Sequence, residues 1–223
     1  MEERKAPAHK GLVLCALYAG SYFIFYTLLK RFNILPRKVL LPYQAILLFL
    51  LAGIGLFLFR EDFKNGIRHW KEKTLRCFFW VIGGYISEML LLTIGSMPLY
   101  LLYPDYTSVN DNTVAAVAKV LSPVLAVLLI GVVGPLTEEL VMRVAMTHKA
   151  AEKIPAALAI LISSLCFMMI HVKAFTPQDL LANIPMFCVG LVYGFIIYKT
   201  KDPTLPILLH IMNNLPAVLG LLL

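Results

Sequence analysis

The stretch VLAVLLIGVVGPLTEELVMRVAM, residues 124–146, decides the fold class because it is apolar almost throughout and yet holds three charged side chains. Its length is enough for a helix that crosses a bilayer core of about 30 Å. The charges are Glu138, Glu139 and Arg143, and they follow directly after Gly134-Pro135, a pair expected to kink or restart the helix. The stretch therefore predicts a membrane helix that carries charges inside its apolar run.

The composition of the whole chain agrees with a membrane protein. Hydrophobic residues make up 60% of the 223 positions and charged residues only 15%, whereas soluble domains are about half apolar and about a quarter charged. The net charge of +7 does not indicate nucleic-acid binding, because the basic residues cluster at the ends of apolar runs, where they act as topology signals. The bilayer is thus the expected partner, and nucleic acid is not.

The distribution of apolar residues predicts the architecture. We expect an all-α fold, a polytopic membrane helical bundle of about seven transmembrane helices in a single domain. The first run is interpreted as a retained helix rather than a cleaved signal peptide, because no clear small-residue cleavage site follows it. The apolar runs are 11–29, 40–59, 75–97, 114–147, 155–172, 180–198 and 204–222.

The positions of Lys and Arg predict the orientation. The most basic connection, 60–76, should be a cytoplasmic loop, and the loops at 148–153 and 198–202 should lie on the same side. The N-terminus is then cytoplasmic as well. The basic segment 30–38 falls outside on this count and disagrees with the rule. His69 and His148, in the basic loops, are expected to be solvated.

Charges at the centre of a bilayer need partners, because each costs about 2.5–3.5 kcal/mol on insertion scales. Glu139 and Arg143 are four residues apart and share a helix face, so they can neutralise each other. Glu138 points about 100° away and is left for another partner. A purely structural ion pair, with Glu138 at the water interface, is the alternative interpretation.

Two further polar pairs occur in later apolar runs. Phe167 and His171 share one helix face, and so do His210 and Asn214. At 1.5 Å per residue, Glu138 and Asn214 lie about 15 Å from the cytoplasmic ends of their helices and His210 about 9 Å. His171 comes out at about 24 Å and joins this layer only if its helix tilts or begins later. Taken singly, an interfacial histidine and an interhelical hydrogen bond explain the two pairs.

Together the three groups suggest water activation. A glutamate can take the proton of a water molecule as general base, helped by a histidine, while histidine and asparagine donors hold a developing oxyanion. The same residue types can instead bind zinc and leave an open position for water. In that case the ligands would be Glu138, His171 and His210.

The three motifs also resemble those of a known family. EExxxR at Glu138–Arg143, FxxxH at Phe167–His171 and HxxxN at His210–Asn214 are similar to the motifs of the CAAX-protease and bacteriocin-processing (CPBP) family, also called Abi. This family includes the Ras-converting CAAX prenyl endopeptidases. The resemblance covers about residues 115–218 and implies an intramembrane endopeptidase with a cavity open to the cytoplasm.

The resemblance implies a role for each motif residue. The catalytic residues would be the base Glu138, its partner His171, and the oxyanion donors His210 and Asn214. Supporting residues would be Glu139, Arg143 and Phe167. The family resemblance leaves open both a metal-dependent and a glutamate-dependent mechanism without metal. We favour no metal, because four supporting protein groups fit a glutamate–water mechanism, with zinc as the alternative. We divide the chain into N-terminal membrane helices, 1–112, and a CPBP-like catalytic core, 113–223.

The resemblance also limits the partners and the alternatives. The substrate is expected to be a peptide or protein at the membrane, either a prenylated tail or a peptide precursor, in a prokaryotic cell membrane. A non-catalytic bacteriocin-immunity or scaffold protein of the same fold is the main alternative. A proton-coupled carrier using Glu88 and Glu138 ranks last. Glu88 is expected to be a neutral, hydrogen-bonded carboxyl, to pair with Lys119 or to line the cavity.

Overall fold

The computed structural model describes every residue except 1–6, 33 and 35. Within the described residues the chain is helical and contains no strand, which confirms the all-α prediction. The N-terminal tail with Arg4 and Lys5, which we predict to be cytoplasmic, lies outside the described residues. Two positions of the basic segment 30–38 lie outside them as well.

The described part of the chain contains six helices that are long and apolar enough to cross a membrane. The fifth predicted run forms the helix Ala156–His171, which is apolar but has only 16 residues and falls short of this length. Five of the other runs are in the expected places, and the fourth, predicted at 114–147, begins later, at Pro123. The protein is therefore an integral membrane protein. The six helices are His9–Leu29, Val39–Leu58, Thr74–Leu102, Pro123–Glu152, Pro177–Thr200 and Thr204–Leu222.

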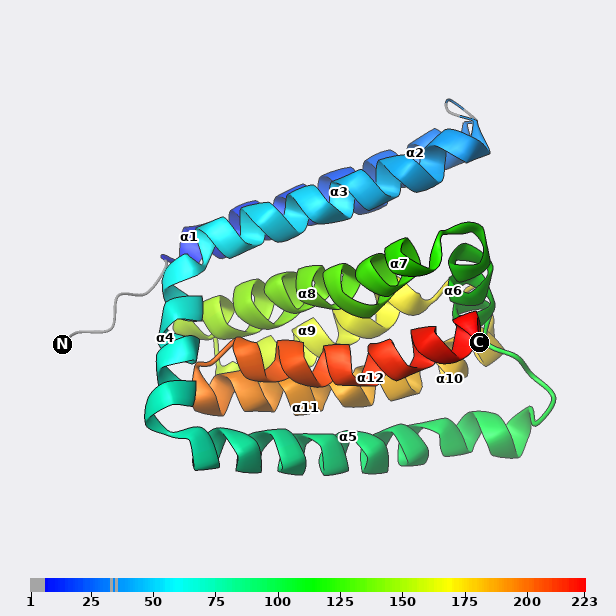
Figure 1. Ribbon diagram of the computed structural model, residues 1–223. Helices are drawn as coiled ribbons and strands as arrows, with labels where there is room; N and C mark the ends of the chain where they lie inside the picture. The colour runs from blue at the N-terminus through cyan, green and yellow to red at the C-terminus, as the bar shows by residue number, and fades with distance from the viewer. Residues whose placement is uncertain (1–6, 33, 35) are drawn as a thin grey trace.

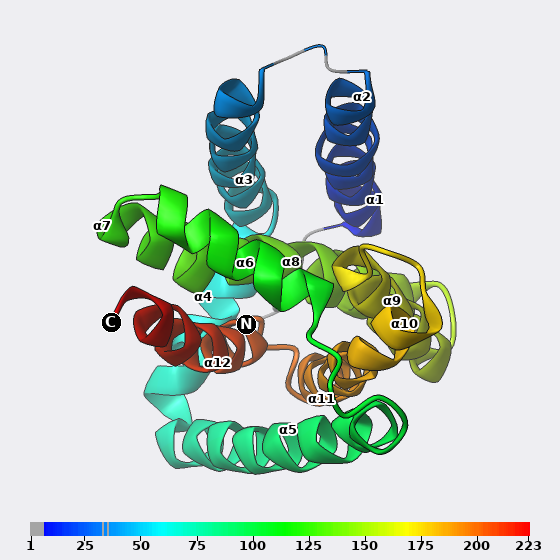
Figure 2. The same cartoon turned by 90° about the vertical axis from the view of Figure 1, so that its right-hand side faces the viewer.

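The helices form a bundle with the motif-bearing elements in its middle (Figure 1). On one side lies a hairpin of two long helices, and on the opposite side lies α5 (Thr74–Leu102); Figure 2 shows the same arrangement along the bundle. The hairpin consists of α1 (Ala8–Leu17), η1 (Tyr18–Phe25), α2 (Tyr26–Arg31) and α3 (Arg37–Leu58). The middle contains α8 (Gly134–Glu139), η3 (Leu140–Lys149), α9 (Ala156–His171), α11 (Ile184–Thr200) and α12 (Thr204–Leu222).

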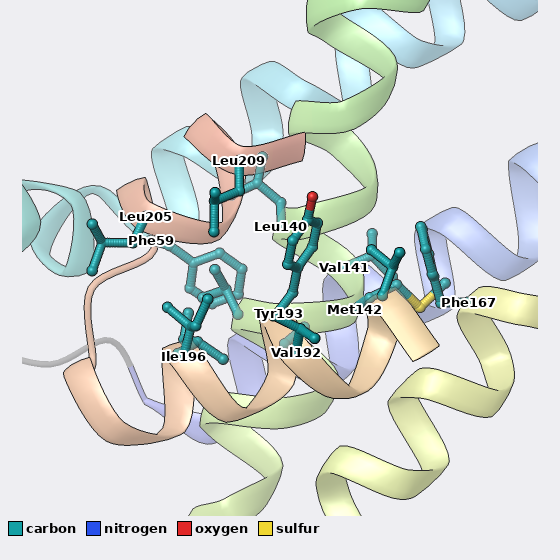
Figure 3. Close-up of a cluster of buried hydrophobic side chains, with 14 of the residues drawn as sticks. Phe59, Leu140, Val141, Met142, Phe167, Val192, Tyr193, Ile196, Leu205 and Leu209 are labelled. Carbon is teal, nitrogen blue, oxygen red and sulfur yellow. The ribbon is translucent and has the colours of Figure 1, made fainter. Parts of the chain in front are cut away.

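Apolar side chains from both halves of the chain form one core. Leu14 and Phe59 from the N-terminal helices are fully buried together with Leu140 and Leu209, and Figure 3 shows a part of this cluster around Tyr193. The shared core confirms the single-domain prediction. The division of the chain into 1–112 and 113–223 stays a prediction.

A glycine brings α5 close to the middle of the bundle. A Cβ atom on Gly84 would lie 2.7 Å from the side chain of Leu209 and 2.8 Å from that of Ile196. Real Cβ atoms do not approach so closely, so a larger residue here would require the ends of the Leu209 and Ile196 side chains to shift. Small residues at such crossings are typical of membrane helices, whose association depends on close packing.

The predicted break at Gly134-Pro135 is wrong. The backbone of Gly134 is helical, with φ −57° and ψ −62°, and the span runs through it. The preceding η2 (Val127–Val133) is a π-helix, and the N–H of Gly134 bonds to the carbonyl of Leu129 five residues back. This wider turn fits the proline, which has no N–H of its own to place in the helix.

The run breaks earlier, before Pro123. Ser122 is extended, with φ −62° and ψ 149°, because the ring of a following proline disfavours helical backbone. The serine side chain caps the new helix by accepting a hydrogen bond from the N–H of Leu125. The break separates α6 (Val109–Val120) from α7 (Pro123–Ala126), and α6 is not part of the membrane span.

The connection 60–76, predicted as a loop, is helical: it forms α4 (Arg60–Glu72), which runs across the ends of the long helices (Figure 1), and the first residues of α5. Its cytoplasmic location stays a prediction. The carboxylate of Asp62 is buried and lies 2.7 Å from the ammonium of Lys149 and 3.6 Å from His148 Nε2. His148 is only 5% exposed, so it is not solvated as expected. The helix η3 continues past the predicted end of the membrane run, and α4 covers it. The remaining short helices are η4 (Ala150–Glu152) and α10 (Pro177–Ala182).

The Asp62 pair predicts how stability changes in acid. Burial by itself raises the pKa of Asp62, but the nearby His148 imidazole and the hydrogen bond from Lys149 outweigh it and hold this pKa below its ordinary value of 3.8. The carboxylate therefore stabilises the fold above about pH 4, and this contribution is lost as the pH falls through the lowered value. Asp62→Asn should reduce the free energy of unfolding at pH 7 by about 3 kcal/mol, because Lys149 is left buried.

This prediction is checked by thermal unfolding of the purified protein in detergent between pH 3 and 7. The exposed Asp105 provides the control, and Asp105→Asn should leave the midpoint unchanged. Since Asp62→Asn removes the titrating group, its midpoint should also fall less in acid than that of the native protein. An equal fall in both proteins would show that Asp62 does not contribute.

Candidate active site

The fully buried ion pair of Glu139 and Arg143 lies at the centre of the site. Arg143 Nε is 3.2 Å from Glu139 Oε2, and neither side chain has exposed surface. The guanidinium carbon lies 4.3 Å from the ring centroid of Phe167 and 5.5 Å from that of Tyr193. Two aromatic faces thus replace water around the cation. The pairing predicted from the spacing of four residues is present.

The second oxygen of Glu139 is bound by the last helix. His210 Nδ1 lies 2.9 Å from Glu139 Oε1. A carboxylate accepts, so Nδ1 carries the proton and Nε2 is free to accept from another group. That Nε2 is directed to Glu138, whose Oε2 is 3.8 Å away. Glu139 therefore fixes the orientation of His210 toward the neighbouring carboxylate.

The two adjacent glutamates have different surroundings. Glu139 has no exposed surface, whereas the side chain of Glu138 is 22% exposed. Glu139 is paired with Arg143 and His210, while Glu138 Oε2 lies 3.8 Å from His210 Nε2. Of this pair, Glu138 is the carboxylate that water can reach.

The histidine on α9 is positioned by its own helix. His171 Nδ1 lies 2.8 Å from the carbonyl oxygen of Phe167, and since a carbonyl only accepts, Nδ1 carries the proton. The ring of Phe167 contacts both imidazoles edge-on, with centroids 4.9 Å from His171 and 5.7 Å from His210. Both histidines are within electrostatic range of each other, and Glu138 is within range of His171. Phe167 therefore separates the two rings, each of which is bonded through Nδ1.

Asn214 is one turn beyond His210 on α12, but its amide is bonded elsewhere. Its Nδ2 donates to the carbonyl oxygen of Ile130, at 3.3 Å. No hydrogen bond joins it to Glu138 or His210 in the part of the chain that the structure describes. The structure thus brings six of the seven predicted site residues into one cluster and places Asn214 at its edge.

Tyr193 and Glu88 belong to the same cluster and were not among the predicted site residues. The hydroxyl of Tyr193 donates to Glu88 Oε1 at 2.8 Å, and both side chains are fully buried. The ring of Tyr193 lies 5.8 Å from that of His210. Glu88 is therefore hydrogen-bonded to a neighbour, as one of the three expectations had it, and it does not pair with the exposed Lys119. A tyrosine in an apolar run gives no sign in the sequence that it binds a carboxyl three helices away.

The Tyr193–Glu88 bond gives a testable expectation. Tyr193→Phe should reduce the free energy of unfolding by about 1–3 kcal/mol, because Glu88 is left buried without a donor. The double variant Tyr193→Phe with Glu88→Met should recover part of this loss, since neither polar group remains. Thermal unfolding in detergent measures both, with Tyr198→Phe on the same helix as the control. A loss that is the same with and without the carboxyl would show that the hydrogen bond is not the cause.

The residues considered above as zinc ligands lie close together without forming a metal site. Among the described residues there is no group of three His, Cys, Asp or Glu side chains placed to hold a metal ion. The predicted ligands Glu138, His171 and His210 are neighbours, but they are not arranged as such a group. The mechanism proposed for this site therefore uses protein side chains and no metal ion.

Comparison with known proteins agrees with the motifs. Residues 120–216 match the family described as type II CAAX prenyl endopeptidase, Rce1-like. The chain is also 27% identical over 156 residues to the Bacillus subtilis (strain 168) protein named "Putative membrane peptidase YdiL". That match covers 70% of this chain but 59% of the relative, so the chain spans less than two thirds of the relative's length. No solved structure matches. The two matches confirm the family resemblance.

Proposed function

We propose, from the match of residues 120–216 to the family of Rce1-like CAAX endopeptidases, that this protein is an intramembrane endopeptidase. It hydrolyses peptide bonds with a water molecule activated by Glu138. The observation that carries the proposal is the approach of Glu138 Oε2 to within 3.8 Å of His210 Nε2, beside the sealed pair of Glu139 and Arg143. A base that water can reach lies next to a fixed imidazole.

The distance between Glu138 and His210 suits a shared water molecule. A water bonded to both atoms at about 2.8 Å forms a triangle with the 3.8 Å separation as its base. Glu138 accepts one proton of that water and His210 Nε2 accepts the other. This holds the water oxygen with a lone pair free for attack on a carbonyl carbon.

The proton transfers then follow a general acid–base sequence. Glu138 takes a proton as the water oxygen bonds to the carbonyl carbon, and the carbonyl oxygen becomes negative. Glu138 next gives the proton to the amide nitrogen, and the carbon–nitrogen bond breaks. His171, with Nε2 unprotonated and Glu138 within electrostatic range, assists the base. The hydroxyl proton of the tetrahedral intermediate passes to His210 Nε2, and the products are a carboxylate and an amine.

The developing oxyanion needs N–H donors. Asn214 supplies its amide, whose second N–H is not used by the bond to Ile130. Once His210 Nε2 has taken the hydroxyl proton of the tetrahedral intermediate it becomes a donor, and the carboxylate of Glu139 at 2.9 Å stabilises that cation. Arg143 balances the charge of Glu139 at all other times.

The substrate is a peptide or protein at the membrane, and the site faces the cytoplasm. The basic residues near the α4 end of the bundle support this orientation through the positive-inside rule. A prenylated C-terminal tail and a secreted peptide precursor both reach a site of this depth. The host membrane is that of a prokaryotic cell, and zinc is not required.

The experiment that tests the proposal compares peptide termini in membrane fractions. Cells with the native protein, Glu138→Ala and the exposed-carboxylate control Glu72→Ala are matched for expression. New termini in the native and Glu72→Ala cells, and none in Glu138→Ala cells, are expected, and they identify substrate and cut site. Identical termini in all three, with any protective phenotype kept by Glu138→Ala, would favour the immunity or scaffold alternative. Activity lost on treatment with a zinc chelator would return zinc to the mechanism.

A further inference from the structure

A groove runs along the side of the bundle between α5 and α11, away from the candidate active site. It has a volume of about 570 Å³ and mostly apolar walls. The two helices lie side by side in both views (Figures 1 and 2). The groove exists because α5 carries small residues here: a Cβ atom on Gly83 would meet nothing within 4 Å. Its lining includes Trp80, Gly83, Ser87, Leu191, Val192 and Phe195.

A polar recess of about 160 Å³ adjoins this groove at the α4 end of the bundle. Arg76 and Trp80 line both cavities, so the apolar groove continues into the recess. The recess is further lined by Lys73 and Lys199. An apolar channel that ends in a cluster of cations has the shape and the polarity of a lipid with an anionic head group.

The charge of the recess is positive. Lys73, Arg76 and Lys199 face one acid, Asp202. Its Oδ1 accepts from the N–H and the hydroxyl of Thr204 at 2.9 Å and 2.6 Å, and its Oδ2 lies 3.9 Å from His69 Nδ1. No ion pair joins Lys73 or Arg76 to an acid in the part of the chain that the structure describes. The recess therefore has cationic donors to spare for an anion.

One cation is tied to the groove itself. The ammonium of Lys199 lies 5.6 Å from the ring centroid of Phe195, and that ring is part of the groove wall. The apolar wall and the positive mouth thus share a side-chain contact. A ligand that fills the groove brings its polar end to this ammonium.

We propose that the groove and the recess together bind one anionic phospholipid. Its phosphate lies at Lys73, Arg76 and Lys199, and an acyl chain lies along α5 and α11. The lipid comes from the leaflet at the α4 end of the bundle, where anionic head groups attract basic residues. The inference does not depend on peptidase activity, because the cavities lie outside the cluster around Glu138.

The test measures lipid retention by native mass spectrometry of the purified, delipidated protein. Dioleoyl phosphatidylglycerol and dioleoyl phosphatidylcholine have the same chains and differ in head-group charge. We expect one phosphatidylglycerol to be retained at least tenfold more tightly than phosphatidylcholine. Each of Lys73→Gln and Arg76→Gln should weaken this retention about fivefold, the effect of one basic residue at an anionic surface. Lys153→Gln, which removes an exposed cation elsewhere, should change nothing.

The groove is tested by filling it. Gly83→Leu should abolish retention of the bound phosphatidylglycerol, because the added side chain occupies the space of the acyl chain. Gly53→Leu on α3 is the matched control, since a Cβ atom there also meets nothing within 4 Å. Both variants are first checked for a native thermal midpoint. The comparison of the two lipids on the native protein needs no variant and decides the question if a variant misfolds.

Three results would overturn the proposal. Equal retention of the two lipids would show a plain acyl-chain groove without head-group recognition. Displacement of the lipid by glycerol phosphate at similar concentration would show a phosphate site that needs no acyl chain. Unchanged retention in Gly83→Leu would place the lipid elsewhere.

Discussion

Glu138→Gln is expected to lower peptide-bond hydrolysis by about 10²–10⁴-fold, the usual contribution of a general base. Glutamine keeps the size of the side chain but cannot take a proton from water. The fold should not change, because the shortest contact that the structure gives Glu138 is 3.8 Å long and its side chain is partly exposed. Turnover is measured on a peptide that spans the cut site found in the terminus survey, with the thermal midpoint recorded alongside.

A variant of the neighbouring Glu139 distinguishes a loss of catalysis from a loss of stability. Glu139→Gln should lower both the activity and the thermal midpoint, because Arg143 is left buried without its carboxylate. Glu72→Gln, an exposed replacement on α4, should alter neither. Full turnover in Glu138→Gln would show that Glu138 is not the base. A midpoint that falls as much in Glu138→Gln as in Glu139→Gln would show a structural role for both.

Arg143→Met should reduce the free energy of unfolding by about 3–5 kcal/mol, the range for removing one member of a buried ion pair. Methionine fills much of the space but leaves Glu139 charged in an apolar core, next to the faces of Phe167 and Tyr193. Denaturant or thermal unfolding in detergent measures the loss. The exposed pair Arg60–Glu61, with an N–O distance of 3.4 Å, provides the control, and Arg60→Met should cost less than about 1 kcal/mol.

A double-mutant cycle shows whether the pair itself is responsible. Arg143→Met combined with Glu139→Gln removes both charges, so its loss should be smaller than the sum of the two single losses by at least about 1 kcal/mol. Strict additivity would mean that Arg143 acts through its aromatic contacts alone. Glu139→Gln and the double variant should also have lower activity, because a glutamine can accept from His210 Nδ1 but carries no charge to stabilise the histidine cation.

The sequence predicted those parts of the site that depend on local periodicity. Glu139 and Arg143 are paired because a helix places residues four apart on one face, and the same rule puts His171 beside Phe167. The general position of the membrane helices followed from the apolar runs. Depth measured along the helices predicted that Glu138 and His210 lie close together, and they do.

Features that depend on tertiary contacts could not be predicted from the sequence. The π-helical turns on either side of Pro135 depend on the backbone of the whole span, and no residue pattern in the sequence predicts them. The sequence of helix α4 resembles a loop because it is polar. Only the buried Asp62–Lys149 contact shows that α4 covers the end of η3. Tyr193 contacts Glu88 because α5 and α11 cross near Gly84, where the absence of a side chain leaves room for close packing.

The Tyr193–Glu88 hydrogen bond joins two residues that the ribosome adds at different times. The partners are 105 residues apart, so Glu88 enters the bilayer well before its donor has been synthesised. At about 5–20 residues per second the interval is about 5–20 s. During that time the carboxyl has no tyrosine, and its least costly form in hydrocarbon is the neutral acid. Insertion of the early helices is therefore coupled to uptake of a proton at Glu88, while Glu139 enters together with its own counter-ion.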